Sequence, residues 1–439
     1  MSGNPKNSQV ADRLPLRIGL LGLGTVGTGF LEAVRGNPYL ADNLILKKVL
    51  VRDLNKPRQV SIPDGLLTTD AYEVIGDPEI DVIVEVLGGE LPAAEYMKDA
   101  LEAGKHVVTA NKEAVAKHGS SLARVAHESQ RQFLFEASVG GGVPVISPLI
   151  RDLAANEITS IKAIINGTTN YILTQMTHYG GDFGDALAQA QELGYAEPDP
   201  ANDIEGVDAA YKVAIMASLA FGGAVPVDSI YREGITKLDA RDFRYAQELG
   251  YAIKLLAIAR HIEGDVEVRV HPTFIQEMHP LAKVDGVFNA VYIEGNLVGP
   301  LLLQGRGAGP SPTSSALIAD VLAISSDYAQ ANPVLSSNAI VLRPIERLAS
   351  GYYLRMQVLD EPGVLYKIAN VFADLGISIA SVIQKEADGM TGTAEIVVTT
   401  HKSIEADIQA GLESLLELDS VSGIGACIRI DLQESEPLQ

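Results

Sequence analysis

Short apolar runs alternate with amphipathic stretches over the first third of the chain. The apolar runs lie at 17–21, 44–51, 81–89, 106–110 and 133–142, and apolar residues at helical spacing fill 91–103 and 112–129. This alternation predicts a parallel, doubly wound sheet with helices on both faces, an α/β fold over residues 15–150. Residues 1–14 are polar and carry no such pattern, so we predict a disordered tail there.

The pattern changes after residue 150. Strand-like runs and three longer helices between 151 and 309 predict an α+β domain with an open sheet, and the apolar helix within 310–345 is expected to return to the first domain. Residues 351–432 read strand, helix, strand, strand, helix, strand, the order of a ferredoxin-like sheet. Such sheets often pair edge to edge with a second copy, which favours a homo-oligomer. We expect this last domain to be removable after about residue 350 without loss of activity.

The first apolar run leads into a glycine motif, Gly22-x-Gly24-x-x-Gly27, in which Thr25 and Val26 precede the last glycine. A strand followed by this motif and a helix is the context that a dinucleotide fingerprint requires. The glycines allow a tight turn, a close approach of the backbone to a pyrophosphate, and close packing of helix on strand. The plain alternative is an ordinary glycine-rich turn. The context favours nucleotide binding, and with it a Rossmann domain.

Residues at the ends of the next strands complete the predicted cofactor site. An NAD-selective site places an acid after the second strand, whereas Arg52 stands there and Asp53 follows it. A guanidinium suits a 2′-phosphate, so NADP is favoured and NAD stays open; a solvated arginine is the alternative. Because ligands bind beyond the carboxyl ends of parallel strands, Gly88, Lys112 and the segment from Glu136 to residue 142 are further candidates.

The stretch 194–212 concentrates five carboxylates and a lysine before an apolar helix. Two prolines stiffen the loop that carries Glu197. Asp208 and Lys212 are four residues apart and share a helical face with apolar residues further along. A surface ion pair is the alternative, but the apolar continuation and the stiff acidic loop favour a site.

The net charge and the cysteine content exclude several classes of partner and of stabilising bond. The net charge of −22 over 439 residues argues against nucleic-acid and anionic-membrane partners, and no apolar run is long enough to span a bilayer. A single cysteine, Cys427, excludes an intramolecular disulfide framework and fits a cytoplasmic protein.

A dinucleotide domain implies hydride transfer. Reduction of a carbonyl needs a group that stabilises the oxygen and donates a proton, for which Lys212 is suited, and the nearby carboxylates suggest a substrate with an ammonium group.

Four motifs then identify a family resemblance. They are GLGTVG at 22–27, TANK at 109–112, NGTTNYIL at 166–173 and GYAEPDP…EGVDAAYK at 194–212. In this order they resemble homoserine dehydrogenase of the long form, over residues 15–350, and the pattern at 360–379 resembles an ACT domain. The resemblance implies reversible NAD(P)H-dependent reduction of L-aspartate 4-semialdehyde to L-homoserine, a step in threonine, methionine and isoleucine synthesis.

The resemblance also implies roles for particular residues. Lys212 is the implied proton donor, Lys112 assists near substrate and cofactor, and Glu197 and Asp208 hold the substrate's amino group and hydroxyl. Gly309 approaches the nicotinamide. A monovalent cation, usually sodium, is implied at main-chain oxygens of the segment with Glu136, Val139, Gly141 and Val143. An amino-acid effector, expected to be threonine, is implied at Asp360, Gly363 and Val364, between two copies of a homodimer or homotetramer.

Three other functions stay open at this point. One is another semialdehyde or sugar oxidoreductase with the same two-domain plan, because fold does not set substrate. Another is an amino-acid sensor with a vestigial enzyme domain, against which the intact Lys112, Lys212, Glu197 and Asp208 argue. The third, a nucleic-acid binder that uses the glycine motif, is disfavoured by the net charge.

Overall fold

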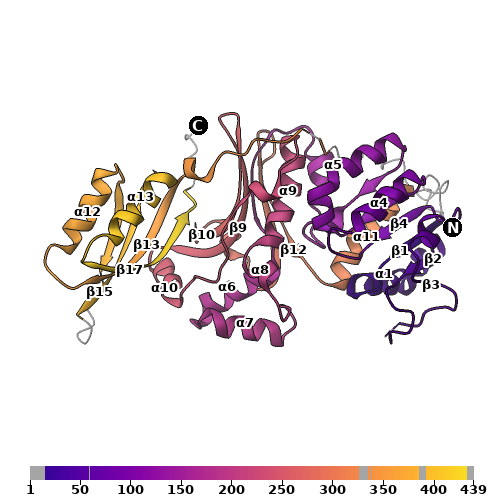
Figure 1. Ribbon diagram of the computed structural model, residues 1–439, viewed down its shortest axis with the longest axis horizontal. Helices are drawn as coiled ribbons and strands as arrows, with labels where there is room; N and C mark the ends of the chain where they lie inside the picture. The colour runs from indigo at the N-terminus through magenta and orange to yellow at the C-terminus, as the bar shows by residue number, and fades with distance from the viewer. Residues whose placement is uncertain (1–14, 59, 326–334, 337, 385–391, 433–439) are drawn as a thin grey trace, which may run out of the picture.

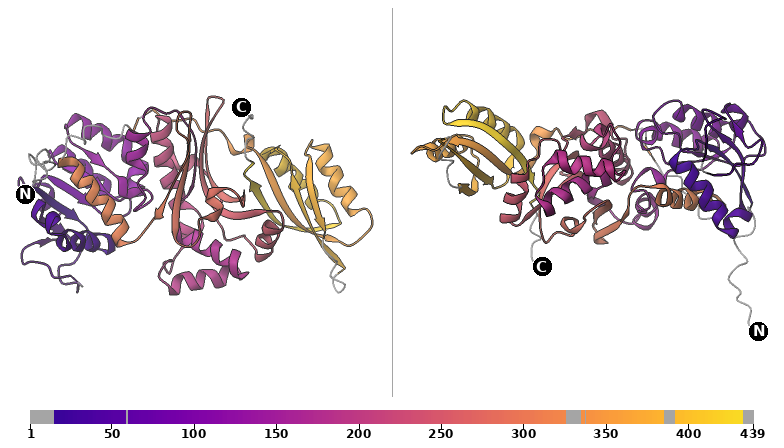
Figure 2. Two further views of the ribbon diagram at one scale, coloured as in Figure 1. Left: turned by 180° about the vertical axis from the view of Figure 1, so that it is seen from behind. Right: turned by 90° about the horizontal axis from the view of Figure 1, so that it is seen from below.

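The protein is elongated, with its three parts arranged along the long axis (Figure 1; Figure 2). The computed structural model describes residues 15–58, 60–325, 335–336, 338–384 and 392–432. The predicted disordered tail at 1–14 lies outside these residues. No helix in the described part of the chain is long and apolar enough to cross a membrane.

The N-terminal domain is built on a six-stranded parallel sheet, which confirms the predicted doubly wound class. Its strands run in the order β3-β2-β1-β4-β5-β6, so the strand order reverses direction between β1 and β4. The strands are β1 (Leu16–Leu21), β2 (Leu44–Leu50), β3 (Leu67–Thr68), β4 (Val82–Glu85), β5 (His106–Thr109) and β6 (Phe133–Leu134). Ligands of such sheets bind where the order reverses.

The last strand of this sheet is shorter than predicted. The sequence predicts a strand over 133–142, but β6 ends at Leu134 and a 3-10 turn, η1 (Glu136–Ser138), follows. The buried Glu136 carboxylate accepts hydrogen bonds from the backbone N–H groups of Val145, Ile146 and Ser147, at 2.6, 2.9 and 2.7 Å. These bonds fold the chain back on itself, so it cannot continue the sheet.

Helices cover both faces of the sheet, and the chain returns to it late, as predicted. The main helices are α1 (Thr25–Gly36), α4 (Ala93–Glu102), α5 (Lys112–Glu128) and the returning α11 (Pro310–Ser325), with shorter α2 (Pro38–Asn43) and α3 (Tyr72–Ile75). Helix α11 lies among the N-terminal elements in Figure 1, and Leu317 and Val321 share an apolar cluster with Phe30 of α1.

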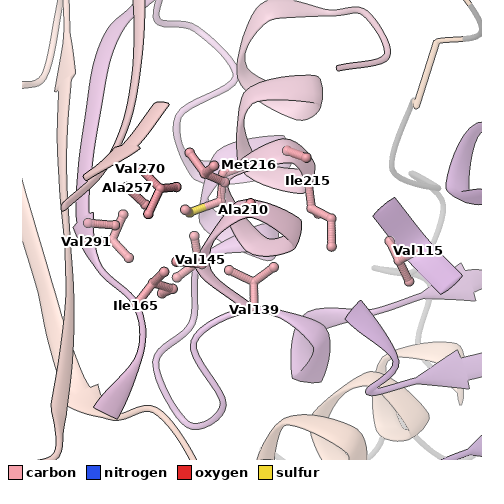
Figure 3. Close-up of a cluster of buried hydrophobic side chains, with 14 of the residues drawn as sticks. Val115, Val139, Val145, Ile165, Ala210, Ile215, Met216, Ala257, Val270 and Val291 are labelled. Carbon is pink, nitrogen blue, oxygen red and sulfur yellow. The ribbon is translucent and has the colours of Figure 1, made fainter. Parts of the chain in front are cut away.

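The middle domain carries an open sheet of β12-β11-β7-β9-β10, as predicted for an α+β domain. The strands are β7 (Ile158–Ile164), β9 (Tyr251–Ile262), β10 (Asp265–Gln276), β11 (Phe288–Gly295) and β12 (Gly299–Arg306). Its helices are α6 (Gly167–Tyr179), α7 (Phe183–Glu192), α8 (Ala201–Ile204), α9 (Val207–Phe221) and α10 (Ala240–Glu248). Helix α9 packs between this sheet and the N-terminal domain. Figure 3 shows Met216 and Ala210 of α9 facing Ala257, Val270 and Val291 of the sheet.

The C-terminal domain has the predicted ferredoxin-like order, β17-β13-β15-β14. Its elements are β13 (Ala349–Leu359), α12 (Val364–Asp374), β14 (Ile379–Gln384), β15 (Thr393–Thr400), β16 (Ser403–Ile404), α13 (Glu405–Leu416) and β17 (Val421–Ile430). Strand β17 also pairs with β10, with Thr273 opposite Arg429 and Phe274 opposite Ile430. The two sheets are therefore one sheet of eleven strands. This continuity argues against the expectation that the domain can be cut away after residue 350.

Candidate active site

Two lysines and one carboxylate meet where the N-terminal and middle domains touch. Asp208, in the first turn of α9, lies with Oδ1 2.5 Å from Lys112 Nζ and Oδ2 2.7 Å from Lys212 Nζ. Asp208 and Lys212 are buried, whereas the Lys112 side chain is 44% exposed. The four-residue spacing therefore forms a buried pair rather than a surface one, and a lysine from 96 residues earlier joins it.

The three groups shift one another's protonation. Burial and the charge of Lys112 lower the pKa of Lys212, although Asp208 raises it. Burial opposes the charge on Asp208, but the two lysines outweigh it and hold the pKa of Asp208 below its usual range. Burial also acts against the charge of Lys112, yet Asp208, Asp203 and Glu197 raise its pKa. Lys212 is thus the more acidic ammonium of the two, as a proton donor should be.

Asn166 and Asp203 complete the cluster and were not assigned by the sequence. The Asn166 amide donates to Asp208 Oδ2 at 2.9 Å and to Asp203 Oδ1 at 2.6 Å. Lys212 Nζ also donates to the carbonyl oxygen of Ile165 at 2.9 Å. The motif at 166–173 was the available signal, since its first residue caps α6 at the end of β7. An ammonium has three protons, so the two bonds of Lys212 leave one for a substrate.

Glu197 lies on the exposed, proline-flanked loop before α8. Its carbonyl oxygen accepts a hydrogen bond from the Gln191 side chain at 3.1 Å. Its carboxylate raises the pKa of Lys112, which places its charge within reach of the cluster. The structure therefore brings Lys112, Asp208 and Lys212 together, and the charge of Glu197 acts on Lys112 from the neighbouring loop.

Glu85 is a further residue that the sequence did not predict. This fully buried carboxylate at the end of β4 accepts from Thr109 Oγ1 at 2.5 Å and from the Leu87 N–H at 2.7 Å. Asn111, which caps α5, donates to Glu85 and to the Gly89 carbonyl. Burial raises the pKa of Glu85, although these hydrogen bonds oppose the rise. The network ties the turn before Lys112 to the turn at Gly88, so the lysine and the predicted cofactor loop form one rigid unit.

A cavity of about 1030 Å³ lies at the carboxyl ends of β1, β2 and β4, where the strand order reverses. Gly22, Gly24, Thr25, Arg52 and Gly88 line it. A β-carbon on Gly27 would collide with the Gly22 carbonyl oxygen, which is the close contact that the motif's last glycine permits. The cavity and glycine placement fit a dinucleotide, whose pyrophosphate would lie at the start of α1.

The remaining predicted cofactor residues differ in how they can contribute. Arg52 is exposed and lines the cavity together with Lys56 and Arg58, so the cavity carries positive charge beside Asp53. The Val26 side chain packs against the core, which leaves only its backbone to face a ligand. Gly309 immediately precedes Pro310, which lines the same cavity from the returning chain.

The predicted cation segment folds as a tight loop. Glu136, Val139, Gly141 and Val143 are all buried, and a β-carbon on Gly141 would collide with the Gly307 carbonyl oxygen. Among the described residues, no N–H or side chain donates to the carbonyl oxygens of Val139, Gly141 or Val143. Unpaired buried carbonyls fit a hard monovalent cation. The Glu136 carboxylate is occupied by three N–H groups, so only its main chain fits the role.

The predicted effector residues lie at the start of α12, remote in sequence from the lysine cluster. Asp360 is exposed and its N–H donates to the Gly392 carbonyl at 3.0 Å. Gly363 caps α12 and Val364 is buried in the core of the C-terminal domain. The turn exposes backbone N–H groups at a helix start, which suits the carboxylate of an amino acid.

Comparison with known proteins decides the family. The family model described as homoserine dehydrogenase matches residues 144–322, and the model described as homoserine dehydrogenase, NAD binding domain, matches 22–136. A homoserine dehydrogenase of Synechocystis sp. is 44% identical over 434 residues, which cover 95% of this chain and 100% of the relative. The chain belongs to the homoserine dehydrogenase family. The resemblance drawn from the four motifs is confirmed.

Solved homoserine dehydrogenases share the fold. The crystal structure of a homoserine dehydrogenase from Thiobacillus denitrificans has a TM-score of 0.88 and 42% identity, covering 95% of this chain and 98% of that one. A hyperthermophilic archaeal homoserine dehydrogenase in complex with NADPH has a TM-score of 0.61 and 28% identity, covering 71% of this chain and 97% of that one. The ACT domain model matches residues 352–420. The protein is thus an NAD(P)-dependent oxidoreductase of this family with a nicotinamide-binding domain and a C-terminal ACT domain.

Proposed function

We propose that the protein interconverts L-aspartate 4-semialdehyde and L-homoserine, a step in threonine, methionine and isoleucine synthesis. The observation that carries the proposal is the Lys112–Asp208–Lys212 cluster, which Glu85 and Asn111 tie to the cofactor loop. A bound nicotinamide cofactor supplies or accepts the hydride. The other requirements of the reaction, which are charge stabilisation and proton transfer, belong to the protein's own side chains.

Each residue has a distinct part in the proposed mechanism. During reduction, negative charge develops on the aldehyde oxygen, and the third N–H of Lys212 donates a proton to that oxygen. The exposed ammonium of Lys112 stabilises the same charge from the N-terminal domain. Asp208 orients both lysines and keeps a lone pair for the substrate hydroxyl, and Glu197 binds the substrate's ammonium group. In the oxidative direction a neutral Lys212 accepts the hydroxyl proton.

The decisive test is oxidation of NADPH by the purified full-length protein with aspartate semialdehyde. Turnover with this substrate, and none with succinate semialdehyde, which lacks the amino group, supports the assignment to Glu197. Absence of turnover with aspartate semialdehyde would overturn the proposed reaction. Equal turnover of both aldehydes would instead assign the protein to a different semialdehyde oxidoreductase.

The preferred cofactor is proposed to be NADP, with NAD as a slower alternative. Arg52, Lys56 and Arg58 supply positive charge where a 2′-phosphate would lie, while Asp53 leaves a partner for a free ribose hydroxyl. The NADPH complex of the archaeal relative also favours NADP.

Sodium is proposed at the carbonyls of Val139, Gly141 and Val143. Steady-state kinetics with each cofactor, in sodium-free and sodium-containing buffer, test both assignments.

Regulation and assembly follow from the ACT domain. We infer that threonine inhibits by binding at Asp360, Gly363 and Val364 between two copies of the chain, in a cytoplasmic homodimer or homotetramer. The open edge at β14 and the backbone N–H groups at the start of α12 support this inference. Inhibition by threonine that survives substitution of Asp360 by alanine would move the effector site elsewhere.

A further inference from the structure

A second cavity, of about 500 Å³, lies where the middle domain, the connecting segment and the C-terminal domain meet. We call it the junction pocket. Six cationic side chains line it: Arg260, Arg269, Arg343, Arg347, Lys402 and Arg429. Three carboxylates line it as well: Glu263, Glu267 and Asp431. Its volume is within the range of about 300–1,000 Å³ that is typical of small-molecule sites. An excess of cations is unexpected in a protein with a net charge of −22.

Some of these cations are neutralised by the protein itself. Arg269 Nη1 lies 2.6 Å from Glu267 Oε2, and Arg429 pairs with Glu405 and Glu233 at 2.6 and 2.9 Å. Asp431 Oδ2 forms an ion pair with Lys162 Nζ at 2.5 Å. These pairs form the wall of the junction pocket and need no ligand.

His271 adds no charge to this wall. Arg269 Nε, which can only donate, lies 3.2 Å from His271 Nε2, so that nitrogen accepts and is unprotonated. The proton therefore sits on Nδ1, which is 2.9 Å from the Pro272 carbonyl oxygen. Burial, with Arg429 and Arg269 nearby, lowers the pKa of His271 well below its usual value.

Three cations of the junction pocket have no carboxylate within hydrogen-bond distance among the described residues. Arg343 Nε is buried and has no hydrogen-bond partner, and the carboxylates nearest to the Arg343 side chain are at 3.8 and 4.0 Å. In the part of the chain that the structure describes, neither Arg347 nor Lys402 forms an ion pair. Arg343 lines the cavity, and a buried guanidinium N–H without an acceptor costs free energy. Turning of this guanidinium toward an oxyanion in the cavity would recover that cost.

We propose that the junction pocket binds a small metabolite with at least two negative charges, of phosphate or carboxylate type. The Arg343 guanidinium supplies one charge from the wall, and Arg347 and Lys402 supply two further charges at the rim. Arg343 and Arg347 belong to the connecting segment, Lys402 to the C-terminal domain, and Arg269 to β10 of the middle domain. One bound anion therefore bridges three parts of the molecule and stabilises the contact between the catalytic and ACT domains. The site is separate from the cofactor cavity and from the start of α12.

Calorimetric titration of the full-length protein tests this proposal. Inorganic pyrophosphate and citrate serve as phosphate and carboxylate probes, and saturating NADPH keeps both out of the cofactor cavity. The variant carries Arg347→Glu and Lys402→Glu, two changes at exposed positions where we expect the fold to be kept. The charge-matched control carries Lys237→Glu and Lys283→Glu, which are exposed and outside the junction pocket.

We expect at least one probe to bind the wild type and the control equally, and to bind the variant at least about tenfold more weakly. The same probe should raise the thermal midpoint of the wild type but not of the variant. The tighter of the two probes identifies the ligand as phosphate or carboxylate. Arg343→Met should also weaken binding, since it removes the guanidinium and keeps the apolar stem.

Two results would overturn the proposal. One is the absence of binding of both probes at millimolar concentration in low salt. The other is equal binding to the variant and the control, which would place the anion elsewhere on the protein. Because binding is measured directly, neither result depends on whether the protein reduces aspartate semialdehyde.

Discussion

The protein contains two largely buried charged networks, and they differ in whether a buried donor is left unused. In the catalytic network, Asp208 holds Lys212 and Lys112, and the Lys112 side chain is still 44% exposed. In the seam network, Asp242 accepts from Arg355 Nε at 2.6 Å and from Tyr353 at 3.0 Å, and Arg355 and Asp242 are 3% and 0% exposed. The Glu395 carboxylate accepts hydrogen bonds from Arg241 Nη1 and from the Tyr245 hydroxyl.

This difference separates a site from a structural contact. In the seam network the Arg241 side chain is 41% exposed, but its nitrogens bond to Asp239 and Glu395, and Arg355 and Tyr353 bond to Asp242. The network can therefore hold α10 against β13 and β15. The catalytic network leaves the Lys112 side chain half-exposed and one proton of Lys212 unused. Burial of charge alone therefore does not indicate function, whereas burial with an unused donor does.

The seam network should show its role in stability. Arg355→Met leaves Asp242 buried without its cation, and we expect the free energy of unfolding to fall by about 3–5 kcal/mol with activity per folded molecule unchanged. Urea denaturation measures the fall. As the control, Arg124→Met removes the exposed pair with Glu128 and should cost about 0.5 kcal/mol or less. A fall for Arg355→Met no larger than the control's would mean that the seam is not structural.

The catalytic network should show its role in turnover. Lys212→Ala removes the proton donor, so we expect kcat to fall at least about a hundredfold while NADPH affinity stays nearly the same. Lys212→Arg should be similarly slow, because arginine keeps the charge but does not release a proton. Lys98→Ala, an exposed position on α4, is the control. Turnover like the wild type's in Lys212→Ala would remove this lysine from the mechanism.

Arg52 tests whether an unpaired cation also marks the cofactor site. Arg52→Ala should raise the KM for NADPH about tenfold, because the 2′-phosphate loses a charged hydrogen-bond partner. The KM for NADH should change little, and it serves as the internal control. Equal changes for the two cofactors would show that Arg52 shapes the loop instead of binding the phosphate.

The pH profile gives the smallest and most specific effect. Reduction requires a protonated Lys212, so the reductive rate should fall as pH rises through the pKa of Lys212. Burial places this falling limb of the pH profile below the pKa of about 10.4 of a free lysine. The oxidative rate should rise through the same pH range. In Asp208→Asn the limb should move to lower pH, since Asp208 raises the pKa of Lys212. An unmoved limb would assign the titration to another group.

Local patterns predicted most of the fold and part of the site. Strand–helix alternation predicted the order of elements, and the glycine motif predicted the cofactor cavity, because both depend on backbone geometry within a few residues. The spacing of Asp208 and Lys212 predicted a pair on one helix face. Glu85 was not predicted, since a single acid at a strand end carries no signal until β5 supplies Thr109 beside it.

The expectation that the C-terminal domain can be removed shows what local patterns cannot predict. Its own strands predicted a ferredoxin-like sheet correctly. Nothing local indicated that β17 would pair with β10, or that Phe274 would stack on Tyr353 with ring centroids 4.5 Å apart. Cutting the chain at 350 would break one sheet and leave Asp242 and Lys162 without their partners, so we expect loss of stability instead of a simple loss of regulation.

By itself, the sequence determined the strand and helix order, the glycine loop and the acidic stretch before Lys212, because these follow from periodicity and turn chemistry. Tertiary structure alone decided which lysine joins Asp208, which carboxylate rigidifies the cofactor loop, and where cations remain unpaired. The reason is physical: the pKa of Lys212, the position of Lys112 beside Asp208 and the unmet N–H of Arg343 depend on distances between segments far apart in the sequence. Burial sets how strongly those charges interact.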